Sequence, residues 1–274
     1  MYNILILSNK SNKEFQDDIY IAESFEKDGH NVDMLWVDYD ENLDEKYDII
    51  IRRNTWFEDE SQADYFKEHN EKLKERLVKK QIKTVNLIGL DGMGKKYLCE
   101  LYRQGKKVVP TIDNIEEALK LEGVTEYVLK DNNSFGSGIG QKMVNKKELL
   151  KKFKEGYLIQ PKIKFISEVQ CYFVANKLMY VFEYTPSKYP SYPKPHLIKL
   201  NEEQERQAIE FANESGLKVG FQRIDFVRLE NDEFLLLEIE DNSPYMSLDK
   251  LDEEFRDNVI EVYKKNIYKY LENG

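Results

Sequence analysis

Apolar and polar positions in the first third of the chain follow two periods. A continuous apolar run at residues 4–7 predicts a buried strand, and apolar residues at helical spacing from 15 to 25 predict a helix that Gly29 ends. Apolar runs at residues 32–37 and 47–51 predict a second and a third strand. Strands that alternate with helices favour a parallel sheet with helices packed on it.

The third predicted strand ends in two arginines, Arg52 and Arg53. Parallel sheets bind their ligands beyond the carboxyl ends of the strands. We therefore expect this pair to hold an anionic substrate, and a basic surface loop is the alternative interpretation.

The middle of the chain predicts a second unit with an anion-binding loop. An amphipathic helix at residues 61–81, a strand at 84–88 and a helix that carries Lys95 and Lys96 lead to a strand at 127–130. That strand ends in Lys130, and the loop after it holds three glycines and two serines. Glycine lets the backbone approach an anion closely, and successive N–H groups can form a phosphate nest. Because the spacing fits neither a P-loop nor a Rossmann loop, a plain hairpin turn remains the alternative.

The last part of the chain predicts antiparallel strands and two helices. A strand at residues 158–163 breaks at Pro161, which predicts a hinge between lobes because proline disrupts sheet pairing. A loop rich in proline and tyrosine at residues 185–195 is expected to lie over a site, with a structural crossing as the alternative. The other elements expected here are strands at 169–175 and 178–184 and helices at 201–215 and 251–271.

The strongest chemical pattern is a predicted hairpin that turns at residues 231–232. Its register sets Asp225 opposite Glu238 and Arg223 opposite Glu240. Side chains alternate between the faces of a strand, so these four charges share one face. Crowded carboxylates repel each other unless a hard cation such as Mg²⁺ lies among them, and Mg²⁺ commonly brings phosphates with it.

The opposite face of the hairpin is apolar. The same register pairs Ile224 with Ile239 and Phe226 with Leu237 as a core-packing surface. The alternative to a metal site on the polar face is a solvated strand face with cross-strand ion pairs.

Composition excludes several classes of function. The net charge of −10 and the pI near 5.1 argue against nucleic-acid binding driven by counterion release. Cys99 and Cys171 are far apart and lack metal-ligand spacing, so we expect reduced cysteines in a cytoplasmic protein. The N-terminal apolar run has no basic region before it, and no run is long enough to span a bilayer, so we expect no membrane partner.

Taken in order, these segments resemble an ATP-grasp protein over nearly the whole chain. Lys95, with Lys96 as the close alternative, matches the first nucleotide-contacting lysine of the family, and Lys130 matches the second. Arg223 matches the phosphate-facing arginine, and Asp225 and Glu238 match the Mg²⁺ carboxylates. The other matching landmarks are the phosphate loop (Ser134, Gly136, Ser137, Gly138), the adenine hinge (Gln160, Pro161, Lys162, Ile163) and the ribose-binding acid Glu168.

The resemblance implies a fold that combines α/β and α+β parts in three domains. They are a Rossmann-like pre-ATP-grasp domain at residues 1–85, a small lobe with the glycine-rich loop at 86–160, and a large lobe with the metal-binding hairpin at 161–274. The two lobes would clamp ATP between them.

Glu240 departs from the pattern of most ATP-grasp proteins, which have an asparagine there. Asn242 stands two residues further on, and Glu-x-Glu with a following proline resembles the subgroup of glutathione synthetase and the D-cycloserine-forming ligase. Glu240 is therefore either a third metal ligand or the ion-pair partner of Arg223. Asn242 is the alternative candidate for the third metal ligand.

The resemblance implies an ATP- and Mg²⁺-dependent ligase, with Mn²⁺ as an alternative metal. It would join the carboxylate of a small molecule or short peptide to an amine, or to a related nucleophile, through an acylphosphate. Arg223 and Lys130 would act in catalysis, and the substrate would meet Arg52, Arg53, Asn242 and Ser243. The alternatives are a non-catalytic ATP-binding regulatory module and an ATP-grasp kinase or cyclo-ligase, and a homodimer remains open.

Overall fold

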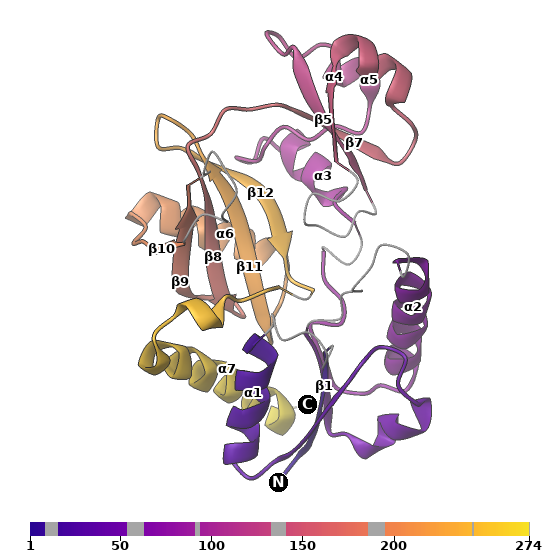
Figure 1. Ribbon diagram of the computed structural model, residues 1–274, viewed down its shortest axis with the longest axis vertical. Helices are drawn as coiled ribbons and strands as arrows, with labels where there is room; N and C mark the ends of the chain where they lie inside the picture. Colours follow the sequence, from indigo (N-terminus) through magenta and orange to yellow (C-terminus); the bar gives the residue numbers. More distant parts are fainter. Residues whose placement is uncertain are drawn as a thin grey trace.

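The computed structural model describes residues 1–8, 16–53, 63–90, 94–132, 141–185, 195–242 and 244–273. In these residues the chain forms three separate sheets with helices packed on them (Figure 1). The mixed α/β character expected from the sequence is therefore confirmed. None of the described helices combines the length and the apolar character that crossing a bilayer requires.

The N-terminal sheet is parallel, as predicted, and its strand order is β2-β1-β3-β4. Helices α1 and α7 cover one of its faces and α2 covers the other. The predicted strand at 84–88 is only two residues long, because Asn86 adopts a positive φ of 57° and leaves the extended conformation. The elements are β1 (Asn3–Leu7), α1 (Gln16–Lys27), β2 (Asn31–Leu35), the 3₁₀-helix η1 (Glu41–Lys46), β3 (Ile49–Arg52), α2 (Ala63–Lys79) and β4 (Thr84–Val85).

The second sheet is small and antiparallel, with strand order β6-β5-β7. One of its faces packs on the short helices α4 and α5 through Tyr127, Leu129 and Ile159. Lys130 and Gln160 alternate with these apolar residues, so they lie on the opposite face. The elements are α3 (Tyr97–Arg103), α4 (Ile115–Ala118), β5 (Glu126–Asp131), β6 (Lys142–Asn145), α5 (Lys146–Lys152) and β7 (Tyr157–Pro161).

The third sheet has five antiparallel strands in the order β10-β9-β8-β11-β12. Helices α6 and α3 cover one face of this sheet. Cys99 and Cys171 are both buried and are not joined in a disulfide. The elements are β8 (Ser167–Val174), β9 (Lys177–Tyr184), β10 (His196–Leu197), α6 (Glu202–Glu214), β11 (Phe221–Arg228), β12 (Phe234–Glu240), the 3₁₀-helix η4 (Leu248–Lys250) and α7 (Glu253–Asn273).

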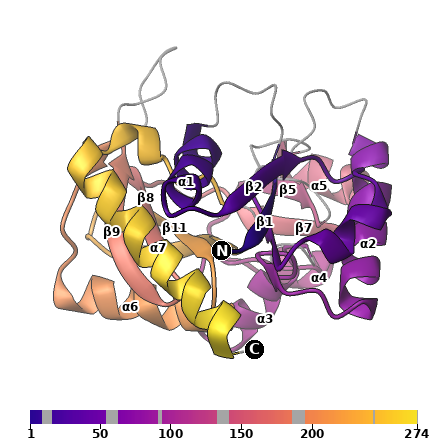
Figure 2. The ribbon, with the colours of Figure 1, turned by 90° about the horizontal axis from the view of Figure 1, so that it is seen from below.

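One hydrophobic core joins the first and the third sheet. It contains Ile4 and Ile49 of the N-terminal sheet, Tyr172 and Phe221 of the five-stranded sheet, and Tyr263 of α7. Helices α1 and α7 lie side by side over this core (Figure 2). The C-terminal helix therefore fixes the N-terminal sheet against the sheet that carries the hairpin.

The register of the hairpin β11–β12 is partly as predicted. Arg223 lies opposite Glu240, and Asp225 lies opposite Glu238. The predicted pair of Phe226 with Leu237 is wrong, because a β-bulge shifts the register and sets Phe226 opposite Leu236. A bulge inserts one extra residue into one strand, which an alternation of polar and apolar residues does not reveal.

Candidate functional site

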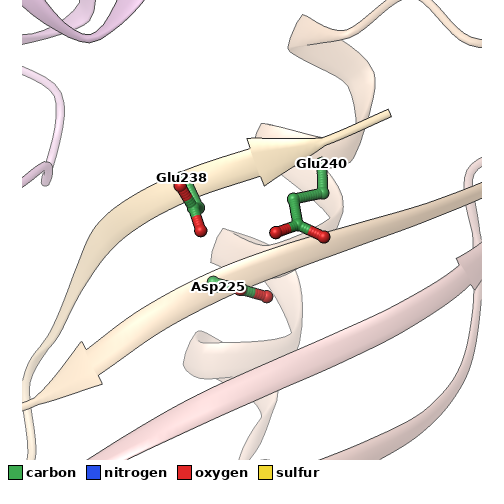
Figure 3. Close-up of side chains that lie close together, drawn as sticks. All are labelled: Asp225, Glu238 and Glu240. Carbon is green, nitrogen blue, oxygen red and sulfur yellow. The ribbon is translucent and has the colours of Figure 1, made fainter. Parts of the chain in front are cut away.

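Three carboxylates converge on the face of the five-stranded sheet that carries Arg223. Asp225 comes from β11, and Glu238 and Glu240 come from β12 (Figure 3). One oxygen of each lies within 4.8 Å of the others, and Asp225 is buried. Carboxylate oxygens at this spacing are the hard ligands that Mg²⁺ prefers, so the donor set fits this ion.

Arg223 holds two of these carboxylates. Its Nε and Nη2 donate to the two oxygens of Asp225 at 2.8 Å each, and Nη2 lies 2.8 Å from Glu240 Oε1. Nη1 donates to the carbonyl of Tyr245 at 3.0 Å. Burial disfavours the charge, but Asp225 and Glu240 outweigh it and raise the pKa of Arg223. Glu240 thus pairs with Arg223 and also belongs to the carboxylate cluster, so this pairing leaves it within the candidate metal site.

Lys95 forms an ion pair with the third carboxylate, Glu238. Burial favours the neutral acid, but the charge and hydrogen bond of Lys95, helped by Lys130 and Arg223, lower the pKa of Glu238. Gly94 permits the turn before Lys95: its φ is +87°, and a Cβ there would lie 2.7 Å from the carbonyl oxygen of Asn132. Lys96 is exposed and lies 3.8 Å from Asp113.

Lys130 is buried on the inner face of the three-stranded sheet without a hydrogen-bond partner among the described residues. Burial lowers the pKa of Lys130 to about 8, while the nearby carboxylates of Glu238 and Glu168 oppose this change. Glu168 lies on β8. Burial, together with the charges of Asp225 and Glu238, raises the pKa of Glu168. The two predicted nucleotide residues, Lys130 and Glu168, are thus within electrostatic reach of the carboxylate cluster.

The predicted adenine hinge lies at the end of β7. The buried amide of Gln160 donates to Thr111 Oγ1 at 2.9 Å. Pro161 is buried, Ile163 is half-buried, and exposed Lys162 forms an ion pair with Glu126 at 2.8 Å.

The predicted substrate residues separate into two groups. Arg52 Nη1 donates to Asn242 Oδ1 at 2.5 Å, so Asn242 is bound to the N-terminal sheet just beyond Glu240. Arg53 is buried, and its Nε lies 3.0 Å from Asp18 Oδ1. The phosphate-loop residues Ser134, Gly136, Ser137 and Gly138, and also Ser243, lie outside the described residues, as do residues 186–194 of the proline-tyrosine loop.

Several residues that hold the segment after β12 were absent from the sequence prediction. Asp17 accepts hydrogen bonds from the backbone N–H groups of Met246 and Leu248, at 2.8 Å each. Asn86 donates to the carbonyls of Phe221 and Asp241 at 2.7 Å each. These partners lie more than a hundred positions apart in the sequence, and Asn86 fell inside the predicted strand at 84–88, so no local signal marked it.

Tyr97 was also absent from the prediction, although the neighbouring Lys95 and Lys96 were part of it. Its hydroxyl accepts a hydrogen bond from the backbone N–H of Ile239 at 2.7 Å. Ile239 stands between the two glutamates of the cluster, so Tyr97 lies immediately behind the candidate metal site.

The fold is similar to that of solved ATP-grasp ligases along nearly the whole chain. A D-cycloserine synthetase, DcsG, matches with a TM-score of 0.71 and 15% identity over 95% of this chain and 99% of that one. The D-alanine–D-alanine ligase from Bacillus anthracis complexed with ATP matches with a TM-score of 0.67 and 15% identity over 99% of both chains. The macrocyclase MdnC from Microcystis aeruginosa, bound with its precursor peptide, matches with a TM-score of 0.69 and 13% identity over 97% of this chain and 100% of that one. No protein-family model and no curated protein matches the sequence.

Proposed function

We propose that this chain, which has the ATP-grasp fold, is an ATP- and Mg²⁺-dependent ligase that forms a carbon–nitrogen bond. The observation that best supports this proposal is the cluster of Asp225, Glu238 and Glu240. Lys95 forms an ion pair with this cluster, and Lys130 interacts with it electrostatically. Three carboxylates and two lysines at one place suit a bound cation and the phosphates that accompany it.

In the proposed reaction the protein contributes position and charge. Lys95 and Lys130 would neutralise nucleotide phosphates, and Arg223 would face the transferring phosphoryl group. The carboxylate cluster would hold Mg²⁺, which when bound neutralises charge on the phosphates. Gln160, Pro161, Lys162 and Ile163 would line the adenine, and Glu168 would bind the ribose. The predicted phosphate loop, with Ser134, Gly136, Ser137 and Gly138, would close on the phosphates.

The bonds change in two steps. A substrate carboxylate oxygen attacks the γ-phosphorus and ADP leaves, which gives an acylphosphate. An amine nitrogen then attacks the acyl carbon, phosphate leaves with the carboxylate oxygen, and the amine loses a proton to solvent. Arg52, Arg53, Asn242 and Ser243 remain our proposed substrate contacts.

The substrates would be a carboxylate and an amine on small molecules or short peptides. The similar structures include a D-cycloserine synthetase, a D-alanine–D-alanine ligase and a macrocyclase bound with a precursor peptide, which supports this range. We also propose the domain limits 1–85, 86–160 and 161–274, in which the first and third domains share the core around α7.

Isotope transfer tests this function. The protein is incubated with ATP, Mg²⁺, a pool of ¹⁸O-carboxylate acids and a pool of amines, and ADP and phosphate are measured. We expect ADP release only when both pools are present, with one ¹⁸O atom transferred into the phosphate. ADP release without ¹⁸O transfer would contradict the acylphosphate, and ATP binding without turnover in any pool would indicate a regulatory module instead.

A further inference from the structure

The strand that carries Glu238 and Glu240 is at the edge of its sheet. An edge strand presents backbone N–H and C=O groups that need partners when they are buried. At Leu236 the chain itself supplies them: Leu236 N donates to the carbonyl of Lys107, and Val109 N donates to the carbonyl of Leu236, both at 2.9 Å. Residues 107–109 therefore act as a short neighbouring strand for this part of β12.

At Ile239 a side chain takes over this role. The backbone N–H of Ile239 donates to the Tyr97 hydroxyl at 2.7 Å, and the same hydroxyl lies 3.4 Å from the carbonyl oxygen of Ile239. One phenol thus meets both outward-pointing backbone groups of one residue, as a paired strand would.

The β-bulge explains why the backbone groups of Ile239, and not those of Glu238, face the edge of the sheet. In a regular strand every second residue points its backbone N–H and C=O groups toward the edge of the sheet. Without an extra residue, the next such residue after Leu236 would be Glu238. The bulge lies between the pairs that Phe226 and Asp225 make with β12, and it moves the outward position to Ile239. The Ile239 side chain is then fully buried in the core, and both flanking glutamates face the cluster.

The residues directly before α3 also contact the carboxylates. Lys95 stands two residues before Tyr97 and forms the ion pair with Glu238. The start of α3 is therefore joined to β12 by one bond to a backbone group and one to a metal-site carboxylate.

We propose that Tyr97 is a positioning residue for the metal site, an inference that rests on the proposed function. By holding the Ile239 backbone it fixes the direction of Glu238 and Glu240, so that both carboxylates meet the same cation. Tyr97 does not touch the reacting atoms; it acts through the two glutamates.

The test is Tyr97→Phe, which removes only the hydroxyl and keeps the ring. Mn²⁺ binding to the protein is measured by electron paramagnetic resonance, alone and with ADP, at a temperature where melting curves show each variant folded. Loss of a residue that orients metal ligands typically weakens metal binding about 10- to 100-fold, and we expect a weakening in this range. Binding of ADP without metal should change less than about twofold, because no nucleotide contact is lost.

Tyr102→Phe is the matched control. Tyr102 lies on the same helix and is half-buried, and within the described residues its hydroxyl makes no hydrogen bond. It should bind Mn²⁺ as the wild type does. A Tyr97→Phe protein with a lower melting temperature but wild-type Mn²⁺ affinity would overturn the proposal, because the hydroxyl would then be purely structural. Absence of Mn²⁺–ADP binding in the wild type would overturn the proposed function itself.

Discussion

The two sheets that carry the proposed nucleotide residues differ in how their charges are balanced. On the five-stranded sheet, Arg223 pairs with Asp225 and Glu240, and Lys95 pairs with Glu238. On the three-stranded sheet, Lys130 is buried without a hydrogen-bond partner among the described residues.

This difference shows which buried charges the protein itself neutralises and which one a bound ligand would have to neutralise. A buried charge is costly unless it is paired, and the carboxylate side is already paired by arginine and lysine. Lys130 interacts with the carboxylates of Glu238 and Glu168 through charge but makes no hydrogen bond among the described residues, so a bound phosphate would give it a direct partner. The carboxylate face should therefore respond to mutation through stability and metal binding, and Lys130 through nucleotide binding.

Removing Arg223 should have the largest effect. Arg223→Met leaves Asp225 and Glu240 without their shared cation inside the fold, and breaking a buried pair costs about 3–5 kcal/mol. Urea unfolding should show this loss of stability. The control is Arg228→Met on the same strand, whose partly exposed pairs with Glu183 and Asp232 should cost only about 0–1 kcal/mol. If both variants lost the same free energy of unfolding, the buried ion pairs of Arg223 would stabilise the fold no more than the partly exposed pairs of Arg228.

Neutralising a cluster carboxylate should abolish turnover without unfolding the protein. Asp225→Asn and Glu238→Gln each remove one metal-ligand charge, and we expect Mg²⁺-dependent ATP turnover to fall by about a hundredfold or more. Asp232→Asn is the matched control at the hairpin turn, where φ is +69°, a conformation that asparagine adopts readily. Full turnover in both cluster variants would refute the metal assignment.

The patterns that succeeded at the sequence level are local. Alternation along β11 and β12 was sufficient to place Arg223, Asp225, Glu238 and Glu240 on one face, because the pairing near them follows the predicted register. It failed at Leu237, because a bulge depends on how the strand packs against the rest of the protein and not on polarity along it.

The partners that fix the site are remote and could not be predicted. Tyr97 and Ile239 are 142 positions apart, and Asp17 and Met246 are 229 apart. Such hydrogen bonds depend on tertiary packing of helices on sheets, and a single tyrosine or aspartate in one sequence carries no sign of them. Arg52 and Arg53 illustrate the same limit: adjacent in sequence, they point to different partners, Asn242 and Asp18.

Replacing Lys95 should change metal and nucleotide binding in opposite directions. In Lys95→Met the Glu238 carboxylate loses its internal cation, so Mn²⁺ alone should bind about tenfold more tightly, while ADP should bind about tenfold more weakly. Calorimetric titration with each ligand separately measures both effects. Lys96→Met is the control, since Lys96 is exposed and 3.8 Å from Asp113. If Lys96→Met weakens ADP binding and Lys95→Met does not, the lysine that contacts the nucleotide is Lys96.

The lowered pKa of Lys130 predicts a smaller effect, a dependence of ADP binding on pH. This pKa of about 8 lies below the ordinary value of 10.5, so below pH 8 Lys130 is charged in both the folded and the unfolded chain and the burial of its charge destabilises the fold. Between pH 8 and 10.5 Lys130 binds more protons in the unfolded chain than in the folded protein. The destabilisation caused by its buried charge therefore decreases as the pH rises. Nucleotide phosphates favour the charged form. Above pH 8 binding must therefore take up a proton, and ADP affinity measured without metal should fall by up to about tenfold per pH unit.

Lys130→Arg separates this titration from other changes with pH. An arginine stays protonated throughout this range, so the fall in ADP affinity between pH 8 and pH 9.5 should disappear in the variant even if its affinity is lower at every pH. A slope that persists in Lys130→Arg would assign the titration to another group. A flat profile in both proteins would mean that Lys130 does not meet the phosphates, and the contrast between the paired face and the unpaired lysine would then have no role in nucleotide binding.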